Sequence, residues 1–144
     1  MTTPATLPAA DQAAVAALTQ RVIAAWAYQD ADGFADVFTE DGSMILPGLY
    51  RKGREEIREY LKDAFENQYK DTQVTGKPLD IRALGADVAL LLTQGGVLAP
   101  GESAVSDEQA IRASWLVVKR DGDWMLAAYQ NSPAVWSLPV PGSR

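Results

Sequence analysis

Cysteine and histidine are both absent from this chain of 144 residues. Without cysteine there are no disulfide bonds, no thiolate nucleophile and no zinc–thiolate site. The lack of histidine removes the commonest metal ligand and the side chain that most easily exchanges protons near neutral pH. Any acid–base chemistry must therefore depend on Asp, Glu, Tyr, Lys or water.

Long apolar segments and an excess of positive charge are missing too. Apolar runs such as residues 88–92 are far shorter than the roughly 20 residues that cross a bilayer, and the N-terminal sequence MTTPATLPAAD does not resemble a secretion signal. With 13 Lys and Arg against 19 Asp and Glu, the formal net charge is -6. Nucleic-acid binding relies on basic side chains that displace counterions, so we expect a protein that binds neither nucleic acid nor membranes. The short apolar runs and the N-terminal sequence predict a cytoplasmic protein.

Motifs for common cofactors and hydrolytic sites are also missing. The chain has no glycine-rich phosphate or dinucleotide loop, no GxSxG and no HExxH, so we expect no cofactor. Acidic residues gather within residues 30–41, but Gly33 comes too early for a calcium-binding loop and no Glu closes one. Helix capping and a solvated acidic face explain this region better, and we expect no metal site.

The composition that remains is typical of a globular protein, with 47% apolar and 22% charged residues. The length predicts one domain. We expect a flexible N-terminus over residues 1–10, a single domain over residues 11–134 and a C-terminal tail over residues 135–144. Asp11 is a candidate N-cap for the first helix.

Helices are expected in the first half of the chain. Apolar residues recur at spacings of three and four between Val15 and Trp26 and predict a helix over residues 11–29. A shorter helix over residues 30–38, capped by Asp30 or Asp32, should lead into a turn and a strand over residues 43–46, which ends at Pro47-Gly48. Gly53 should open a third helix.

Strands are expected in the second half, where apolar residues alternate or run together, over residues 73–75, 79–84, 88–98, 109–120 and 124–131. Asp121-Gly122 between two apolar runs predicts a β-hairpin. Helices ahead of almost all strands suit an α+β fold in which a curved sheet wraps around helices and leaves a pocket at its open end. Residues 99–108 form a long loop, either a lid or disordered.

The last two predicted strands are apolar on both faces. Alternation places Ile111, Ala113, Trp115 and Val117 opposite Ala110, Leu116 and Val118, and it places Trp124, Leu126 and Ala128 opposite Met125, Ala127 and Tyr129. An antiparallel sheet with one solvated face would carry polar residues on that face instead. We therefore expect a homodimer in which a second copy of the chain covers the outer face of the sheet.

Candidate ligand-binding residues are polar side chains in apolar surroundings and large side chains that can form pocket walls. The polar candidates are Tyr60, Arg112, Ser114, Tyr129, Gln130 and Asn131, and the candidate walls are Trp26, Met44, Phe65 and Trp115. Each of them can also serve structure alone. Asp80 and Arg82 share one strand face, either as a base and its orienting partner in a pocket or, as we favour, as a solvated ion pair.

Several segments together resemble the SnoaL-like branch of the nuclear-transport-factor-2-like superfamily, and within it the bacterial SgcJ/EcaC group. They are Trp26 with the following DADGFADVFTEDG, Pro47-Gly48 with KGREEI, residues 112–115, and RDGDWMLAAYQNS from Arg120. The similarity covers roughly residues 10–134. These motifs indicate the superfamily well and the reaction poorly, because such folds host unrelated functions.

The resemblance implies a cone-shaped α+β barrel, a curved and mostly antiparallel sheet around three N-terminal helices, usually dimeric through the outer face. Leu46 occupies the position at which an isomerase of this family carries its base Asp, and the Arg-x-Asp pair of the epoxide hydrolases is reversed as Asp80-Ile-Arg82. Neither activity is therefore expected. The SgcJ-type ending is intact as Tyr129, Gln130, Asn131 and Ser132.

These observations predict a protein that binds a largely apolar small molecule, a polyketide or polyene intermediate of enediyne-type natural-product biosynthesis. It would assist cyclisation or rearrangement through Tyr, a carboxylate or confinement alone. The alternative is a non-catalytic ligand carrier or dimerisation module. A buried carboxylate with a raised pKa would favour the enzyme, and an entirely apolar cavity would favour the carrier.

Overall fold

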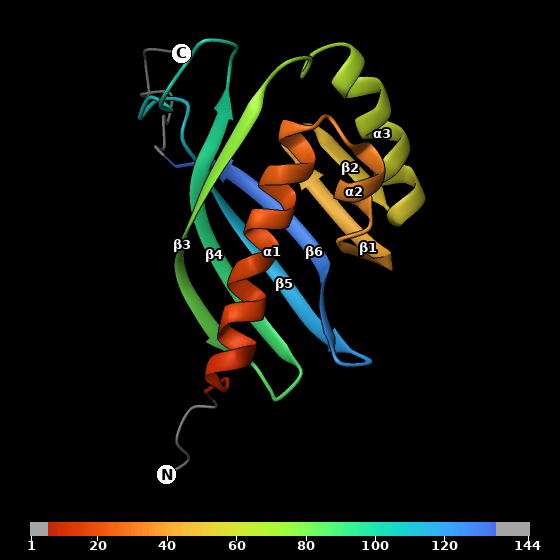
Figure 1. The fold of residues 1–144 in the computed structure, drawn as a ribbon, viewed down its shortest axis with the longest axis vertical. Coiled ribbons are helices and arrows are strands. Elements are labelled where there is room, and N and C mark those ends of the chain that lie inside the picture. Colours follow the sequence, from red (N-terminus) through yellow and green to blue (C-terminus); the bar gives the residue numbers. More distant parts are fainter. Residues whose placement is uncertain (1–5, 135–144) are drawn as a thin grey trace, which may run out of the picture.

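A computed structural model describes residues 6–134 of the protein. Its elements in chain order are α1 (Ala9–Ala27), α2 (Ala31–Ala35), β1 (Phe38–Leu46), β2 (Leu49–Lys52), α3 (Arg54–Glu66), β3 (Gln73–Ala83), β4 (Val88–Leu98), β5 (Ile111–Arg120) and β6 (Asp123–Pro133). The strands form one sheet in the order β2-β1-β6-β5-β4-β3 (Figure 1). Between residues 6 and 134, β1 and β6 are the one parallel pair, so the α+β fold with a mostly antiparallel sheet is confirmed.

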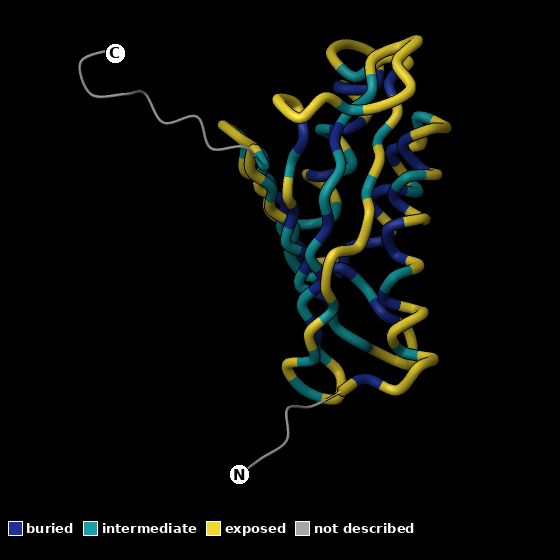
Figure 2. Tube along the Cα trace, turned by 90° about the vertical axis from the view of Figure 1, so that its left-hand side faces the viewer, coloured by how far each residue is buried: buried dark blue, intermediate teal, exposed yellow. Residues whose placement is uncertain are grey.

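The helices form a layer against one face of the curved sheet, which we call the inner face (Figure 2). The buried apolar core lies between this face and the helices. No element in the described part of the chain covers the opposite, outer face. The expected tail over residues 135–144 lies outside the described residues, and none of the helices between residues 6 and 134 is long and apolar enough to span a membrane.

The start of α1 differs from the expectation. The helix begins at Ala9, and its N-cap position is Pro8, which makes no side-chain capping bond. Asp11, expected to be the cap, lies in the first turn and accepts hydrogen bonds from Trp124 Nε1 at 3.0 Å and Lys119 Nζ at 3.1 Å. Leu7, within the segment expected to be flexible, is buried in the core. Tertiary partners from the sheet therefore fix this end of the helix.

The acidic segment, residues 30–41, caps α2 and connects it to α3 through ion pairs. Asp30 caps α2 by accepting a hydrogen bond from the Gly33 amide at 2.9 Å. Asp32 and Asp36 pair with Arg58 of α3 at 2.7 and 3.3 Å, and the hydrogen bond from Arg58 lowers the pKa of Asp32. The helix ends before Phe38, earlier than expected, because Phe38 begins β1.

A short strand that the sequence did not predict follows Pro47-Gly48. Residues 49–52 form β2 and pair with β1 from Leu46↔Leu49 to Ser43↔Lys52. Pro47-Gly48 therefore makes a hairpin turn and does not simply end a strand. The third helix begins at Arg54 after Gly53, as predicted.

Two bulges change which side chains face the core. Strand β3 is continuous where two strands were predicted, and its register shifts between Pro78 and Asp80. Leu79, which lies at this shift, is 52% exposed. Asp80 and Arg82 are also exposed, but the expected ion pair between them is not among those formed within residues 6–134.

The second bulge lies in β6, after the hairpin that Asp121-Gly122 predicts. Both turn residues have positive φ, 52° and 84°, and the turn joins β5 to β6. The register then shifts between Leu116↔Ala128 and Val117↔Leu126, which leaves Ala127 as an extra residue. The expected assignment of Tyr129 to the face opposite Leu126 is therefore wrong, because the extra residue turns Tyr129 inward.

Candidate functional site

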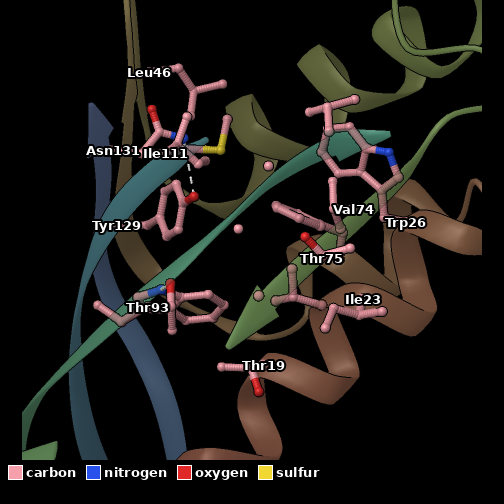
Figure 3. Close-up of a pocket in the computed structure, with 18 of the residues that line it drawn as sticks. Thr19, Ile23, Trp26, Leu46, Val74, Thr75, Thr93, Ile111, Tyr129 and Asn131 are labelled. Atoms are coloured by element: carbon pink, nitrogen blue, oxygen red, sulfur yellow. Dashed lines mark hydrogen bonds between the residues drawn. The ribbon is translucent and has the colours of Figure 1, made fainter. Parts of the chain in front are cut away.

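A cavity lies between the helices and the inner face of the sheet (Figure 3). The space that the centre of a water-sized sphere can occupy is about 90 Å³, and the empty space between the walls, including the open mouth, is about 790 Å³. The first measure corresponds to several water molecules.

Five of the ten predicted ligand-binding residues line this cavity. They are Trp26, Met44, Trp115, Tyr129 and Asn131. The structure thus brings together residues of α1, β1, β5 and β6 that are far apart in the sequence. Their contact with a ligand stays a prediction.

The other five predicted residues do not line the cavity. Phe65 lies behind Trp26, with the ring centroids 5.1 Å apart, and Tyr60 packs under Arg51. Arg112 donates to Gln94 Oε1 on the outer face of the sheet at 3.1 Å. Gln130 pairs in register with Ser114, and both residues lie on the same outer face, because neighbouring residues of a strand point to opposite faces.

Trp26 forms one wall and is held by its indole nitrogen. Nε1 donates to Thr72 Oγ1 at 2.9 Å, and Thr72 in turn donates to the Tyr69 carbonyl at 2.6 Å. The rings of Phe34, Phe65 and Tyr69 surround the indole at centroid distances of 4.9 to 6.0 Å. This wall is therefore rigid and apolar toward the cavity.

Trp115 forms the facing wall on β5. Its Nε1 donates to Thr93 Oγ1 at 2.9 Å, and its ring meets Tyr129 edge to face at 5.2 Å. Both indole nitrogens that border the cavity are thus already paired within the protein. Neither is available to orient a ligand.

Tyr129 and Asn131 supply the polar feature of the cavity. Asn131 Nδ2 donates to the Tyr129 hydroxyl at 3.1 Å (Figure 3), while Asn131 Oδ1 is buried without a hydrogen-bond partner among the described residues. Burial raises the pKa of Tyr129, and burial followed by the neighbouring Tyr60 raises the pKa of Tyr69 to about 12. Both phenols therefore remain neutral at physiological pH and can donate hydrogen bonds.

The lining carries no charge. None of the 21 described residues that line the cavity is Asp, Glu, Lys or Arg. Between residues 6 and 134 there is also no group of three or more Asp and Glu residues that could hold a metal ion. The described lining therefore offers hydroxyl and amide groups for recognition and no carboxylate for proton abstraction.

Several lining residues were not predicted, among them Thr93, Tyr69 and the glycines of β3 and β4. Gly95-Gly96 lies inside a predicted strand, where glycine often marks a close approach of another backbone, so this signal was present in the sequence. The loop after β4 returns over these glycines. A Cβ at Gly96 would lie 2.8 Å from Val105 Cγ1.

The model of the SnoaL-like domain matches residues 15–136, most of the chain. The chain belongs to the SnoaL-like family. The SnoaL-like fold is thereby shown for this protein, whereas the narrower SgcJ/EcaC grouping is not.

Solved structures with the same fold are similar to this SnoaL-like protein. A domain of unknown function with a cystatin-like fold from Nostoc punctiforme is 28% identical with a TM-score of 0.82, covering 90% of this chain and 80% of that one. A ketosteroid isomerase-like protein from Erwinia carotovora is 20% identical with a TM-score of 0.72, covering 90% and 100%. An NTF-2 like protein of unknown function from Shewanella oneidensis is 18% identical with a TM-score of 0.71, covering 85% and 98%. A comparison with curated proteins finds no match.

Proposed function

We propose that this SnoaL-like protein binds a neutral, largely apolar small molecule in the cavity between its helices and the inner face of its sheet. The observation that carries the proposal is the uncharged lining, with two tryptophan walls and a single Tyr129–Asn131 couple. Small-molecule sites characteristically combine apolar walls with a few placed polar groups. A charged ligand would lose its hydration here without gaining a counter-charge.

The proposed ligand class is a polyketide or polyene intermediate of natural-product biosynthesis. Two features support it: two indole rings line the cavity and can pack against a conjugated apolar chain, and the SgcJ-type ending is present at Tyr129 to Ser132. The protein would hold such a chain in a folded conformation, and positioning alone can lower a cyclisation barrier by several kcal/mol.

The lining favours confinement or carriage over acid–base catalysis. Leu46, at the position where the resemblance places an isomerase base, contributes an aliphatic side chain to the cavity. Without a lining carboxylate, a proton would have to be taken by a neutral phenol, and burial raises the pKa of Tyr129. A non-catalytic carrier is therefore the second candidate, and the charge-free wall is the observation that supports it.

We also propose that a second copy of the chain covers the outer face of the sheet. Apolar side chains on this face include Leu90, Leu92, Leu116 and Met125, all of them only half-buried in the single chain. Ile45 and Tyr50 extend the patch across β1 and β2 and are 43% and 56% exposed. Contiguous apolar surface of this kind characterises interaction sites, and a self-complementary sheet face suits a twofold dimer.

The binding proposal is tested by native mass spectrometry of protein purified from the cells that produce it. We expect a population heavier than the polypeptide by one small molecule, which organic solvent releases. Incubating the released molecule with fresh protein then separates the two candidates, because an enzyme converts it and a carrier returns it unchanged. If gently purified protein carries no small molecule and no added pathway intermediate binds, the proposed function is wrong.

A further inference from the structure

A buried acceptor in the cavity lacks a partner. Asn131 Oδ1 is buried and accepts no hydrogen bond from any residue between 6 and 134, although the same amide donates through Nδ2 to Tyr129. Native proteins pair the great majority of their buried polar atoms, because an unpaired one has lost its hydration without compensation. Asn131 lines the cavity, so a bound molecule can supply the missing donor.

Beside Asn131, the Tyr129 hydroxyl is a hydrogen-bond donor without an acceptor. The Tyr129 oxygen receives the Asn131 amide hydrogen at 3.1 Å, and the phenolic hydrogen has no acceptor among the hydrogen bonds of the described residues. Trp115 holds the ring edge to face at 5.2 Å, which keeps the hydroxyl in the cavity wall. One free acceptor and one free donor thus lie side by side in the cavity wall, on the neighbouring side chains of Asn131 and Tyr129.

Few chemical groups can pair with the free acceptor of Asn131 and the free donor of Tyr129 at once. A hydroxyl group donates one hydrogen bond and accepts others, whereas a ketone or ether oxygen only accepts. A carboxylate also only accepts, and it would bring a negative charge into a cavity without a described basic lining residue. The pair is therefore complementary to a neutral hydroxyl group.

We propose that the cavity selects neutral, largely apolar molecules that carry a hydroxyl group, and that this hydroxyl docks between Tyr129 and Asn131. The inference rests on the proposed function and specifies its ligand. It also holds if the Asn131 amide is turned over, since a hydroxyl then accepts from Nδ2 and donates to the Tyr129 oxygen, making two bonds where a ketone makes one.

The test uses three probes of one size and shape: α-tetralol, α-tetralone and the hydrocarbon tetralin. Their affinities are measured by titration calorimetry or by quenching of tryptophan fluorescence, since Trp26 and Trp115 line the cavity. We expect the alcohol to bind about tenfold more tightly than the ketone, the ratio that one additional buried hydrogen bond supplies.

Two cavity variants and one control variant show which residues cause the preference for the alcohol. Asn131→Leu and Tyr129→Phe should reduce the alcohol-to-ketone ratio to about one while tetralin still binds. Gln130→Leu changes the residue between them, which faces the outer side of the sheet, and should leave the ratio near ten. Thermal unfolding of each variant shows whether the fold is retained, and the wild-type ratio decides the question even if a variant does not fold.

The outcomes separate this inference from the proposed function. Equal affinity of the wild-type protein for alcohol and ketone overturns hydroxyl selection while the cavity remains a binding site. Selection that persists in both Asn131→Leu and Tyr129→Phe places the hydroxyl elsewhere and also overturns the inference. If none of the three probes saturates the protein, the proposed function fails and the inference fails with it.

Discussion

At the scale of single residues, Asp11 connects the start of α1 to the β5–β6 hairpin. Its carboxylate accepts hydrogen bonds from Trp124 Nε1 and Lys119 Nζ, and these bonds, the one from Trp124 first, lower the pKa of Asp11 below its ordinary value of 3.8. A carboxylate whose pKa is lowered by folding stabilises the folded state at pH values above the ordinary pKa of that carboxylate. That contribution disappears as the pH falls through the lowered value.

We predict that Asp11→Asn lowers the melting temperature at pH 7 and reduces the further loss of stability on acidification below about pH 4. Asn retains an acceptor but no charge, so Lys119 loses its ion-pair partner. The measurement is thermal unfolding by circular dichroism at a series of pH values. Glu59→Gln, at an exposed site on α3, is the matched control and should follow the wild type; a variant at Asp11 that does so too would contradict the assignment.

Residue-level reasoning from the sequence was right where local chemistry decides and wrong where tertiary partners decide. Asp30, one of the two predicted caps, caps α2, because the capping bond is made within three residues. Asp11 met the same local criterion, yet its carboxylate is engaged by side chains 108 and 113 residues away. No sequence pattern near Asp11 indicates that Lys119 and Trp124 are its partners.

At the scale of elements, the β3–β4 pair depends on a glycine. Gly95 and Gly76 are register partners, but their surroundings differ. A Cβ at Gly95 would collide with the Thr75 carbonyl, whereas one at Gly76 would meet nothing within 4 Å. The close backbone approach at Gly95 also forms part of the cavity wall.

We predict that Gly95→Ala lowers the free energy of unfolding by about 2 kcal/mol, within the range for overpacked sites. The added methyl group has no room unless the two strands move apart. Gly76→Ala should change the free energy of unfolding by less than about 0.5 kcal/mol. Urea denaturation measures both, and similar values for the two variants would show that the collision does not determine stability.

The order and kind of most elements could be predicted from periodicity, but which side chains face the cavity could not. Strand β4 has the predicted bounds, and the Asp121-Gly122 turn is where the sequence indicates it. A bulge shifts the facing of every later residue by one, and no local signal marks the extra Ala127. This is why Tyr129 was assigned to the wrong face in the sequence analysis.

At the scale of the whole molecule, the proposed dimer follows from the uncovered outer face. We predict that sedimentation gives about twice the chain mass of 15.5 kDa and that Leu116→Glu gives the monomer. Leu116 lies half-buried near the middle of the outer face, where a charge would lose its hydration in the interface.

Tyr28→Glu provides the matched control for this experiment. Tyr28 is 84% exposed just after α1, on the helical side of the molecule, so the same change from apolar to acidic should leave the dimer intact. A wild-type protein that remains monomeric at high concentration, or a Leu116→Glu variant that still dimerises, would contradict the proposed interface.

The most direct test of the central claim is a calorimetric titration of tetralin into the wild-type protein and into Val97→Trp, whose indole would fill the cavity that Val97 lines. Leu84→Trp adds the same indole at a site that is 53% exposed. We predict saturable one-to-one binding with a negative heat-capacity change for the wild type and Leu84→Trp, and loss of binding for folded Val97→Trp. Equal binding to all three proteins, or saturable binding to none, would contradict a ligand site between the helices and the sheet.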